Sequence, residues 1–418
     1  MRILILTQYY PPEVGAPQNR LFDLAKRLTK LGHVVTILTA LPNYPKGEIF
    51  AGYRDHVIME EYIEGIRVIH TWIYTTKNNG FVQRLLNYFS FVLSSLIGGI
   101  WKIKQQDVVI VESPPLFLGL SGFIISKLKR AKLVFNVSDL WPESAIAMGI
   151  LNNKILIDLS ERLEAFLYRK SNLITGQTQG IVKSIQSRFP DKPVSLVTNG
   201  INVEAFKSIS QSDQGEGAKK EFGLAGKIVV GYAGLHGLAQ CLETVLQAAQ
   251  LLIEYQDLFF AFFGDGPQKE NLTDLANQAK LTNVCFYPIQ PAWRMPDIIA
   301  LFDIAIIPLR KLELFKGALP SKMFEAMAAA VPVIVSIDGE AQVLVEKAQA
   351  GIYVEPENPE AMAKAVLQLY KASPYRKALG QNGRQYVIEH YNRHQIALDF
   401  ERLLLAIHRN GSGRTTVT

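Results

Sequence analysis

The feature that most constrains this 418-residue sequence is a repeated alternation of short apolar segments with longer amphipathic ones. The short segments are apolar throughout, which is typical of strands buried on both faces of a parallel sheet, and the longer segments have helical periodicity. One series of strand-like segments covers residues 2–6, 34–38, 108–111, 132–136 and 173–175. A second series covers residues 227–232, 258–263, 284–287, 304–308 and 333–336. The sequence therefore predicts an α/β protein with two doubly wound, Rossmann-like domains.

The chain length agrees with two domains, because single hydrophobic cores rarely grow beyond ~250–300 residues. We place the boundary after residue 195, so that the domains cover residues 1–195 and 196–390. Residues 208–217 are polar and rich in Gly and Ser, which predicts a loop. Residues 391–410 are expected to form a terminal helix, and residues 411–418 a disordered tail.

Residues 81–103 are strongly apolar and approach the length of a membrane span. Asn87, three serines and the pair Gly98 and Gly99 interrupt this stretch, and it lies inside the first strand series. A span would put the two ends of one domain on opposite sides of a membrane, so we reject that interpretation. A helix that is partly core and partly a membrane-interface contact, or a purely buried helix, remains open.

The positive charge is concentrated in the first half of the chain. Residues 1–195 contain 23 Lys and Arg against 15 Asp and Glu, whereas the remainder contains 21 against 23. This asymmetry favours an anionic partner for the first domain, such as a membrane surface, a nucleic acid or a phosphorylated substrate, although an ordinary surface is an alternative.

The N-terminus and the cysteines both favour a reducing, cytoplasmic location. The first ten residues have the period of a buried strand and no small-residue cleavage site follows them, unlike a signal peptide. The two cysteines, Cys241 and Cys285, lie in apolar strings and are too few for a disulfide framework.

The strongest candidate site in the second series is the loop and helix at residues 315–328. Gly317, Pro320 and Ser321 lead into a helix whose first turn contains Lys322, so free backbone N–H groups and an ammonium converge on one point, as a diphosphate requires. Glu325 lies on the same helix face and could accept hydrogen bonds from ribose hydroxyls. An exposed ion pair at the helix start is the alternative.

Two glycine-rich loops of the second series and two loops of the first series are further candidates, because ligands bind beyond the carboxyl ends of parallel strands. The second-series loops cover residues 231–240 and 262–272. The first-series loops are residues 7–20, which contain Glu13, Gly15 and Arg20, and residues 136–145, which contain Asp139 and Glu143. Helix capping is the alternative for the two acidic residues of the last loop.

Two function classes lack their usual motifs. The first loop has no G-x-G-x-x-G fingerprint, which argues against a nicotinamide or flavin enzyme. No D-x-D carboxylate pair stands at a strand end to hold Mg²⁺ or Mn²⁺, so we expect neither a metal nor a cofactor.

The chain resembles the family-four retaining glycosyltransferases of the GT-B fold, in which two Rossmann-like domains face each other across a cleft. It is most similar to bacterial enzymes of surface-polysaccharide and lipopolysaccharide synthesis, of the N-acetyl-L-fucosamine transferase type. The resemblance covers nearly the whole chain. It rests on MRILILTQYYPPEVGAPQNR, VSDLWPES, VTNGIN, GYAG, GDGP and, most specifically, LFKGALPSKMFEAMAAAVPVI.

The resemblance implies a metal-independent hexosyltransferase that moves a sugar, such as an N-acetylated hexosamine or 6-deoxyhexosamine, from a UDP-sugar to a polyprenyl-diphosphate-linked acceptor. It also implies that the second domain binds the donor, that the first domain binds the acceptor, and that the helix over 391–410 packs back on the first domain. The catalytic residues would be Asp139, Lys322 and Glu325. The other donor-binding residues would be Gly15, Gly234, His236, Gly264, Gly266, Gly317, Ala318, Leu319, Pro320 and Ser321. Glu13, Arg20 and Glu143 would bind the acceptor.

Together with the basic first domain and residues 81–103, the resemblance implies peripheral association with the inner face of the membrane. No nucleic-acid partner is expected, because no recognised motif accompanies the basic residues.

The sequence departs from the family pattern at three sites. The first residue of the usual glutamate pair is replaced by Gly317, and the usual Arg and Lys of the glycine loop are replaced by Leu235 and Gln240. Ser138 stands in the place of a frequent histidine. These changes shift the neutralisation of the diphosphate onto Lys322, with Lys316, Arg310 or His236 as possible helpers.

Three alternatives stay open at this point. One is a sugar-nucleotide epimerase of the same fold, which would need more carboxylates and histidines than this chain offers. Another is a non-catalytic protein that binds a sugar nucleotide and assists another transferase. The third is a nucleic-acid-binding protein, which salt-sensitive oligonucleotide binding would reveal.

Overall fold

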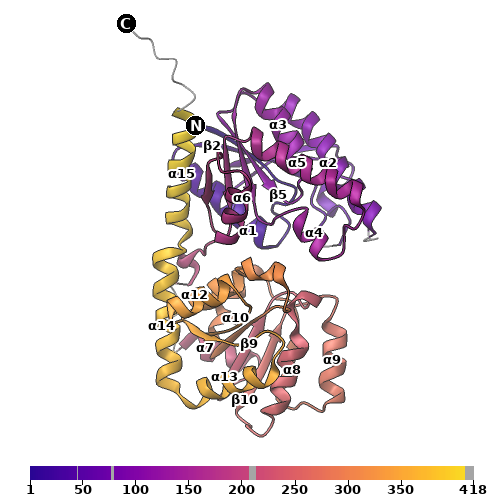
Figure 1. Ribbon diagram of the computed structural model, residues 1–418. Helices are drawn as coiled ribbons and strands as arrows, with labels where there is room; N and C mark the ends of the chain where they lie inside the picture. The colour runs from indigo at the N-terminus through magenta and orange to yellow at the C-terminus, as the bar shows by residue number, and fades with distance from the viewer. Residues whose placement is uncertain (45, 77–79, 207–212, 410–418) are drawn as a thin grey trace. The chain divides into compact units, whose positions relative to one another are not determined.

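The computed structural model describes residues 1–44, 46–76, 80–206 and 213–409, and the chain divides into two compact units (Figure 1). One unit combines Met1–Asn199 with the segment that begins at His394, and the other is Gly200–Arg393. The division falls four residues after the boundary expected from the sequence. The tail predicted over 411–418 lies outside the described residues. Each unit has its own sheet and core.

The N-terminal unit contains an eight-stranded sheet of order β3-β4-β2-β1-β5-β6-β7-β8. All neighbouring strands are parallel except the edge pair β3 and β4. The strands are β1 (Arg2–Leu6), β2 (Val34–Ala40), β3 (Ile58–Ile63), β4 (Ile66–Thr71), β5 (Val108–Ser113), β6 (Lys132–Val137), β7 (Leu173–Gly176) and β8 (Val194–Leu196). The buried, uniformly apolar strands were predicted from the sequence.

The β3–β4 hairpin was not predicted. Its turn is Glu64 and Gly65, whose φ values are 46° and 80°. Both turn residues therefore have the left-handed conformation of a tight two-residue hairpin. β4 is largely buried beside β2, whereas β3 is the partly exposed edge strand, and the Glu-Gly turn between them was the available signal.

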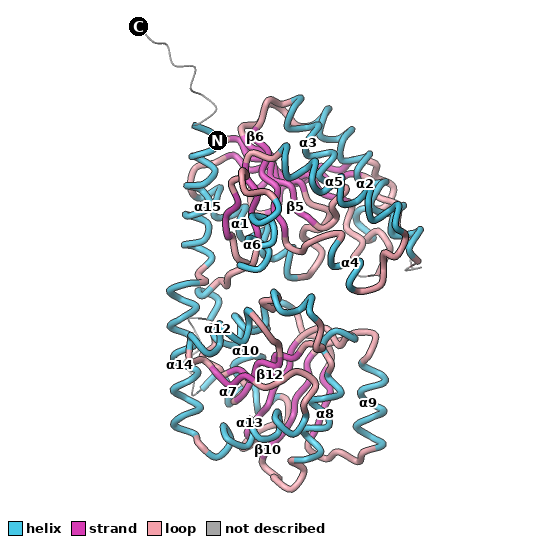
Figure 2. Tube along the Cα trace, in the orientation of Figure 1, coloured by secondary structure: helices cyan, strands magenta, loops and turns pink. Residues whose placement is uncertain are grey.

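Helices cover both faces of this sheet, as the tube in Figure 2 shows. One face packs against α2 (Phe81–Lys102), α3 (Leu118–Leu128), α5 (Lys154–Lys170) and α6 (Gln179–Arg188), and the short α4 (Glu143–Ala147) follows β6. The other face packs against α1 (Ala16–Lys30) and α15 (Arg393–Arg409). The apolar residues of the strands thus form a core on each side of the sheet.

Helix α15 is the helix that the sequence predicted over 391–410. It packs on the N-terminal unit, where Phe400 and Leu404 are buried in the same cluster as Leu21 of α1. The His33 imidazole lies 2.7 Å from a carboxylate oxygen of Glu401, which adds a polar contact to the apolar one.

The C-terminal unit contains a six-stranded parallel sheet of order β11-β10-β9-β12-β13-β14. Its strands are β9 (Ile228–Ala233), β10 (Leu258–Phe263), β11 (Val284–Tyr287), β12 (Ile304–Pro308), β13 (Val333–Ser336) and β14 (Gly351–Tyr353). One face packs against α7 (Asp213–Glu221), α10 (Met295–Ala300), α11 (Ser321–Ala328) and α12 (Glu340–Ala348). The other packs against α8 (Leu242–Leu251), α9 (Lys269–Gln278) and α13 (Pro359–Lys371), and α14 (Ser373–His390) contributes to both cores.

Helix α7 corrects one expectation. The polar, glycine-rich residues 208–217 suggested a loop, but the helix begins at Asp213, and Ala218 is buried in the core. Residues 208–212 lie outside the described part of the chain.

Helix α2 has two different faces. Its inner face packs into the core through Phe91, and its two glycines allow close approach to the sheet: a Cβ at Gly98 would lie 2.6 Å from Thr71 Cγ2. Its outer face exposes a row of apolar side chains that we call the outer stripe: Val82, Leu86, Leu93, Ile97, Ile100 and Trp101. Of the helices in the described ranges, none is long and apolar enough to cross a membrane.

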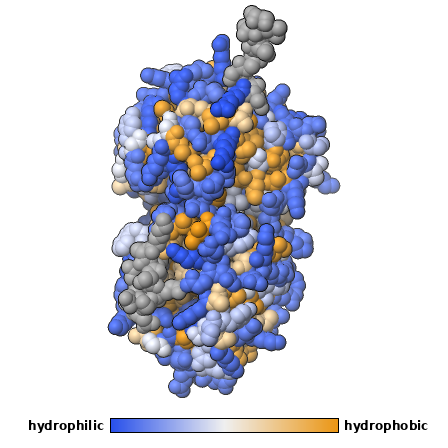
Figure 3. Space-filling view, turned by 90° about the vertical axis from the view of Figure 1, so that its left-hand side faces the viewer, coloured by the Kyte–Doolittle hydropathy of each residue, from blue (hydrophilic) through white to orange (hydrophobic). Residues whose placement is uncertain are grey.

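The face of the molecule in Figure 3 has a different surface. Hydrophilic side chains dominate both units in this view, and apolar residues form smaller groups between them. A continuous apolar row along one helix, like the outer stripe of α2, is a different kind of surface.

Candidate functional site

The topology of each sheet marks one edge where a ligand can bind. The chain moves outward from β1 to β2 on one side and to β5 on the other, and β9 is flanked in the same way by β10 and β12. At such switch points the loops after the two central strands separate and leave a crevice. The candidate residues from the sequence lie mainly on these loops.

Lys322 lies in the first turn of α11, beside the loop after β9. Its side chain crosses Gly234 so closely that a Cβ at position 234 would lie 2.0 Å from Lys322 Cε and 2.7 Å from Nζ. The φ of Gly234 is +144°, which side chains also disfavour. The Lys322 ammonium is 5.4 Å from the centre of the Tyr232 ring, a cation–π contact. The absence of a side chain at Gly234 therefore leaves the space that the Lys322 side chain occupies.

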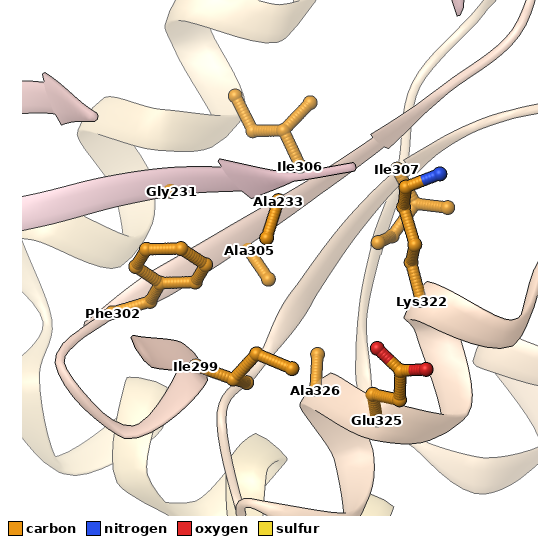
Figure 4. A pocket seen from close by; sticks show the side chains of 10 residues that line it. All are labelled: Gly231, Ala233, Ile299, Phe302, Ala305, Ile306, Ile307, Lys322, Glu325 and Ala326. Carbon is orange, nitrogen blue, oxygen red and sulfur yellow. The ribbon is translucent and has the colours of Figure 1, made fainter. Parts of the chain in front are cut away.

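Lys322 and Glu325 are charged groups that form no ion pair. Neither side chain forms a hydrogen bond or an ion pair with any residue in the described ranges. Burial lowers the pKa of Lys322 and raises the pKa of Glu325, while the two charges, and Arg393 for Glu325, act in the opposite direction. Figure 4 shows both side chains rising from the same side of α11, next to apolar residues such as Ala326 and Ile307. Uncompensated charges at a half-buried position are costly unless a ligand supplies the missing partners.

The two glycine-rich loops of the C-terminal unit pack directly on each other. A Cβ at Gly264 would lie 1.9 Å from the carbonyl oxygen of Gly234, and one at Gly266 would lie 2.5 Å from the carbonyl oxygen of His236. The Lys269 ammonium donates to the carbonyl oxygen of Gly264 at 2.8 Å. The predicted donor-binding residues of both loops are therefore brought together with Lys322.

Three residues were proposed to share the neutralisation of the diphosphate with Lys322, and each is neutral or ion-paired in the structure. The His236 ring is fully buried, and burial lowers its pKa to about 4, so the imidazole is neutral and brings no charge at neutral pH. Arg310 forms an ion pair with Glu243, and Lys316 lies 2.7 Å from Glu313. In the free protein, therefore, these three groups are neutral or already paired, whereas Lys322 forms no ion pair with any of the described residues.

The loop that precedes α11 holds the remaining predicted donor residues. Gly317 ends a short 3-10 helix (Glu313–Gly317), and Pro320 is the extended residue just before α11. Gly339 lies beneath this segment with a φ of +85°, where a Cβ would lie 2.1 Å from the carbonyl oxygen of Lys316. Ala318, Leu319 and Ser321 are all partly exposed. This segment leads directly to the N-terminus of α11.

Arg20, predicted to bind the acceptor, takes part in a buried network. Its guanidinium is 2.6 Å from a carboxylate oxygen of Glu112 and 3.3 Å from Ser138 Oγ. Asn136 donates to the other oxygen of Glu112 at 2.7 Å and accepts from Thr175 at 2.6 Å. Arg20 is only 6% exposed, so from the interior of the unit it holds together the end of β5, through Glu112, and the loop after β6, through Ser138.

Glu13 is also more buried than a ligand-binding role suggests. Its Oε1 accepts hydrogen bonds from the backbone N–H groups of Asn43 and Tyr44, at 2.7 and 2.8 Å. Burial raises the pKa of Glu13 to about 7. Glu13 thereby ties the loop after β1 to the loop after β2. Gly15, predicted to bind the donor, lies in the N-terminal unit immediately before α1, with extended backbone.

Asp139 lines a cavity of about 220 Å³, which we call the head cavity. Burial raises the pKa of Asp139, which marks it as a group suited to chemistry or binding. Arg84 and Tyr88 of α2 line the same cavity. Glu143, the first residue of α4, is exposed and is not among the lining residues.

The sequence analysis missed three residues of these sites. Glu112 is the penultimate residue of β5, and an acidic side chain within an otherwise apolar strand was the signal. Lys269 lies inside the range predicted for the second glycine-rich loop, as the first residue of α9, and Arg84 lies near the start of the apolar stretch of α2. The described residues include no group of three or more His, Cys, Asp or Glu side chains that could hold a metal ion.

Comparison with known proteins identifies the class of this two-unit fold. A family model described as "Glycosyl transferase 4-like domain" matches residues 15–200, and one described as "Glycosyl transferases group 1" matches residues 217–386. Together they cover most of both units. The N-terminal unit thus matches the glycosyl transferase 4-like domain and the C-terminal unit matches the group 1 glycosyl transferases, and the chain is a glycosyltransferase with the GT-B fold.

Individual relatives give the same class. WcaI of Escherichia coli (strain K12), which has a provisional name as a colanic acid biosynthesis glycosyl transferase, is 25% identical over 380 residues, 88% of this chain and 92% of WcaI. The sucrose-phosphate synthase structure from Thermosynechococcus elongatus has a TM-score of 0.74 at 16% identity, covering 98% of this chain and all of that one. Anabaena Alr3699/HepE in complex with UDP-glucose has a TM-score of 0.72 at 16% identity, covering 97% and 100%.

Proposed function

We propose that the protein is a retaining, metal-independent hexosyltransferase of surface-polysaccharide synthesis, related to N-acetyl-L-fucosamine transferases. It transfers an N-acetylated hexosamine or 6-deoxyhexosamine from a UDP-sugar to a polyprenyl-diphosphate-linked acceptor. It works in the cytoplasm at the inner face of the membrane. The C-terminal unit binds the donor, and the N-terminal unit binds the acceptor.

The observation that carries this proposal is the pair of unpartnered charges on α11. In the proposed complex, the Lys322 ammonium and the first N–H groups of α11 bind the diphosphate, and the Glu325 carboxylate accepts hydrogen bonds from the ribose hydroxyls. Both ligand groups supply what the free protein lacks, an anion for Lys322 and donors for Glu325. The HepE structure, whose title names UDP-glucose, supports a donor of this chemical class.

The proposed mechanism stabilises the leaving group by electrostatics. As the bond between the sugar and the diphosphate breaks, negative charge grows on the diphosphate, and a fixed ammonium with helix N–H groups stabilises that charge. Asp139 contacts the transferred sugar or the acceptor hydroxyl. Retention of the anomeric configuration requires no enzymic base in line with the acceptor.

The acceptor side of the proposal rests on the N-terminal unit. Its excess of basic residues attracts anionic lipid headgroups, and the outer stripe of α2 can enter the interfacial region of a bilayer. The name of WcaI, which refers to colanic acid biosynthesis, supports a polysaccharide pathway.

The test is hydrolysis and transfer from a panel of nucleotide sugars in the presence of EDTA, with the wild type, Lys322→Ala and Glu325→Ala. We expect one UDP-sugar to be turned over without metal. Each variant should lose at least about 100-fold in kcat/KM, because each removes a charged contact to the donor. Proton NMR of the product then reports the anomeric configuration.

A matched control lies just before α11. Glu313 and Lys316 have the same spacing as the tested pair but are more exposed and ion-paired with each other, so Lys316→Ala should leave turnover nearly unchanged. Equal losses in Lys316→Ala and Lys322→Ala would overturn the assignment of the donor site. Binding of nucleotide sugars without turnover on any polyprenyl-linked acceptor would favour the non-catalytic alternative.

A further inference from the structure

A second cavity adjoins the head cavity of the N-terminal unit. It has a volume of about 290 Å³ and lies between α2, α3 and α5. We call it the tail cavity, and it is lined mainly by apolar side chains, including Phe89, Leu120, Leu156, Leu159 and Leu163. The two cavities have four lining residues in common, Leu85, Phe117, Trp141 and Leu151.

The shared wall contains two aromatic rings, those of Phe117 and Trp141, and Phe89 of the tail cavity packs beside them. The ring centres of Phe89 and Phe117 are 4.7 Å apart, and those of Phe117 and Trp141 are 5.2 Å apart. Such rings form a rigid apolar surface that changes little when a flexible hydrocarbon chain binds against it. The two cavities therefore adjoin, with a polar end at Asp139 in the head cavity and an apolar end in the tail cavity.

The polar end also carries a cation. Arg84 lines the head cavity and is exposed, and its side chain forms no ion pair with any residue in the described ranges. A guanidinium in this setting complements a phosphate or diphosphate group. An anionic head followed by an apolar chain fits this order of groups.

A third apolar cavity fits this ligand less well. The outer groove, about 520 Å³, is lined by residues of the outer stripe such as Leu93 and Ile97 together with Trp72 of the neighbouring loop. It has no lining residue in common with the head cavity, so a chain that begins near Asp139 does not continue into it directly.

We infer that the tail cavity is a subsite for the first isoprene units of the lipid acceptor, with Arg84 binding the diphosphate at its entrance. The inference rests on the proposed function and specifies where the acceptor binds. The volume lies at the small end of ligand pockets, which span about 300–1,000 Å³, so only the first units are held by the protein. The remainder of the chain stays in the membrane.

Direct binding tests this subsite without requiring turnover. The ligands are prenyl diphosphates with one, two, three or four isoprene units, kept below their aggregation limit without vesicles or detergent, and binding is measured by titration calorimetry. We expect the affinity to rise with each of the first units and then to stay constant once the cavity is full. Leu159→Gln should weaken binding of the three-unit ligand about tenfold. Arg84→Gln should weaken all four ligands by a similar factor.

Leu93→Gln is the matched control. Leu93 and Leu159 are exposed leucines of the same unit, 63% and 56% exposed, but only Leu159 lines the tail cavity. Leu93→Gln should bind the prenyl diphosphates like the wild type. Absence of binding at every chain length, no gain with length, or equal losses in both leucine variants would overturn the inference.

The outcome is distinguishable from failure of the proposed function. If the prenyl series binds as expected but no nucleotide sugar is turned over, the subsite stands and the catalytic proposal fails. If a nucleotide sugar is transferred to acceptors of all chain lengths with the same KM, the catalytic proposal stands and the tail subsite is wrong.

Discussion

Glu13 should make the stability of the N-terminal unit depend on pH. Its side chain is only 2% exposed, and its Oε2 has no hydrogen-bond partner among the described residues. Burial raises its pKa from the ordinary 4.5 to about 7, although the N–H groups of Asn43 and Tyr44 act in the opposite direction. Between these two values the folded chain keeps a proton that the unfolded chain releases, so the free energy of unfolding falls as the pH rises.

The size of the effect follows from the shift in pKa. A difference of about 2.5 pKa units corresponds to a loss of roughly 3 kcal/mol between pH 4.5 and pH 8. Glu13→Gln removes the titrating group but keeps an oxygen that can accept the two backbone hydrogen bonds. Relative to the wild type, the variant should therefore gain stability progressively above pH 5, by up to about 3 kcal/mol at pH 8.

Urea unfolding at pH 5, 6, 7 and 8 measures this dependence. A short hydrogen-exchange pulse with mass spectrometry of peptides from the N-terminal unit separates its unfolding from that of the other unit. Glu161→Gln, which makes the same chemical change at an exposed position of α5, should follow the wild type at every pH. If the curves of Glu13→Gln and the wild type stay parallel from pH 5 to pH 8, Glu13 titrates normally and the reasoning from burial is refuted.

Three further substitutions test the glycine next to Lys322, the buried network of Arg20 and the outer stripe of α2. Gly234→Ala should destabilise the C-terminal unit by ~1–3 kcal/mol, because a side chain disfavours the positive φ at this position. It should also weaken UDP binding at least about tenfold, because the new methyl group displaces Lys322. Unchanged UDP affinity in calorimetry would contradict this expectation. Arg20→Met should lower the free energy of unfolding in denaturant by ~3–5 kcal/mol, because it leaves the buried Glu112 carboxylate without its cation. Adding Glu112→Leu should restore much of the lost stability. Additive losses from the two substitutions would rule out this coupling. Trp101 lies in the outer stripe and is 80% exposed. Trp101→Ser should weaken binding to anionic vesicles about tenfold in a sedimentation assay, without changing the turnover of soluble acceptors. If the variant binds vesicles as well as the wild type, the outer stripe is not the membrane contact.

The parts of the fold that could be predicted are those whose burial produces a recognisable pattern of apolar residues in the sequence. Strands buried on both faces, such as β1 and β5, appear as uninterrupted apolar runs, so both parallel sheets were expected. The hairpin β3–β4 was missed because its edge strand β3 is partly exposed and contains two adjacent glutamates, so it lacks the uninterrupted apolar run of a buried strand. Helix α7 was missed because polar and glycine residues make up most of it.

The candidate site was predicted where local sequence determines the geometry. A glycine-rich loop followed by a helix with Lys322 in its first turn specifies the position of that lysine by itself. The roles of Arg20 and Glu13 could not be derived in this way, because they depend on partners 92 and 30 residues away, Glu112 and Asn43. For the same reason, the sequence did not indicate that His236 is neutral, since aromatic residues of other strands bury it.

The return of α15 to the N-terminal unit has a consequence for synthesis of the chain. The apolar face of α1, which Phe400 and Leu404 complete, becomes available as soon as the first 199 residues emerge, but its partner is made last. At translation rates of ~5–20 residues per second, this face waits on the order of 10–40 s for α15. The first unit to be synthesised is therefore the last to be finished, and during that interval its uncovered face is the part of the nascent chain that a chaperone would bind.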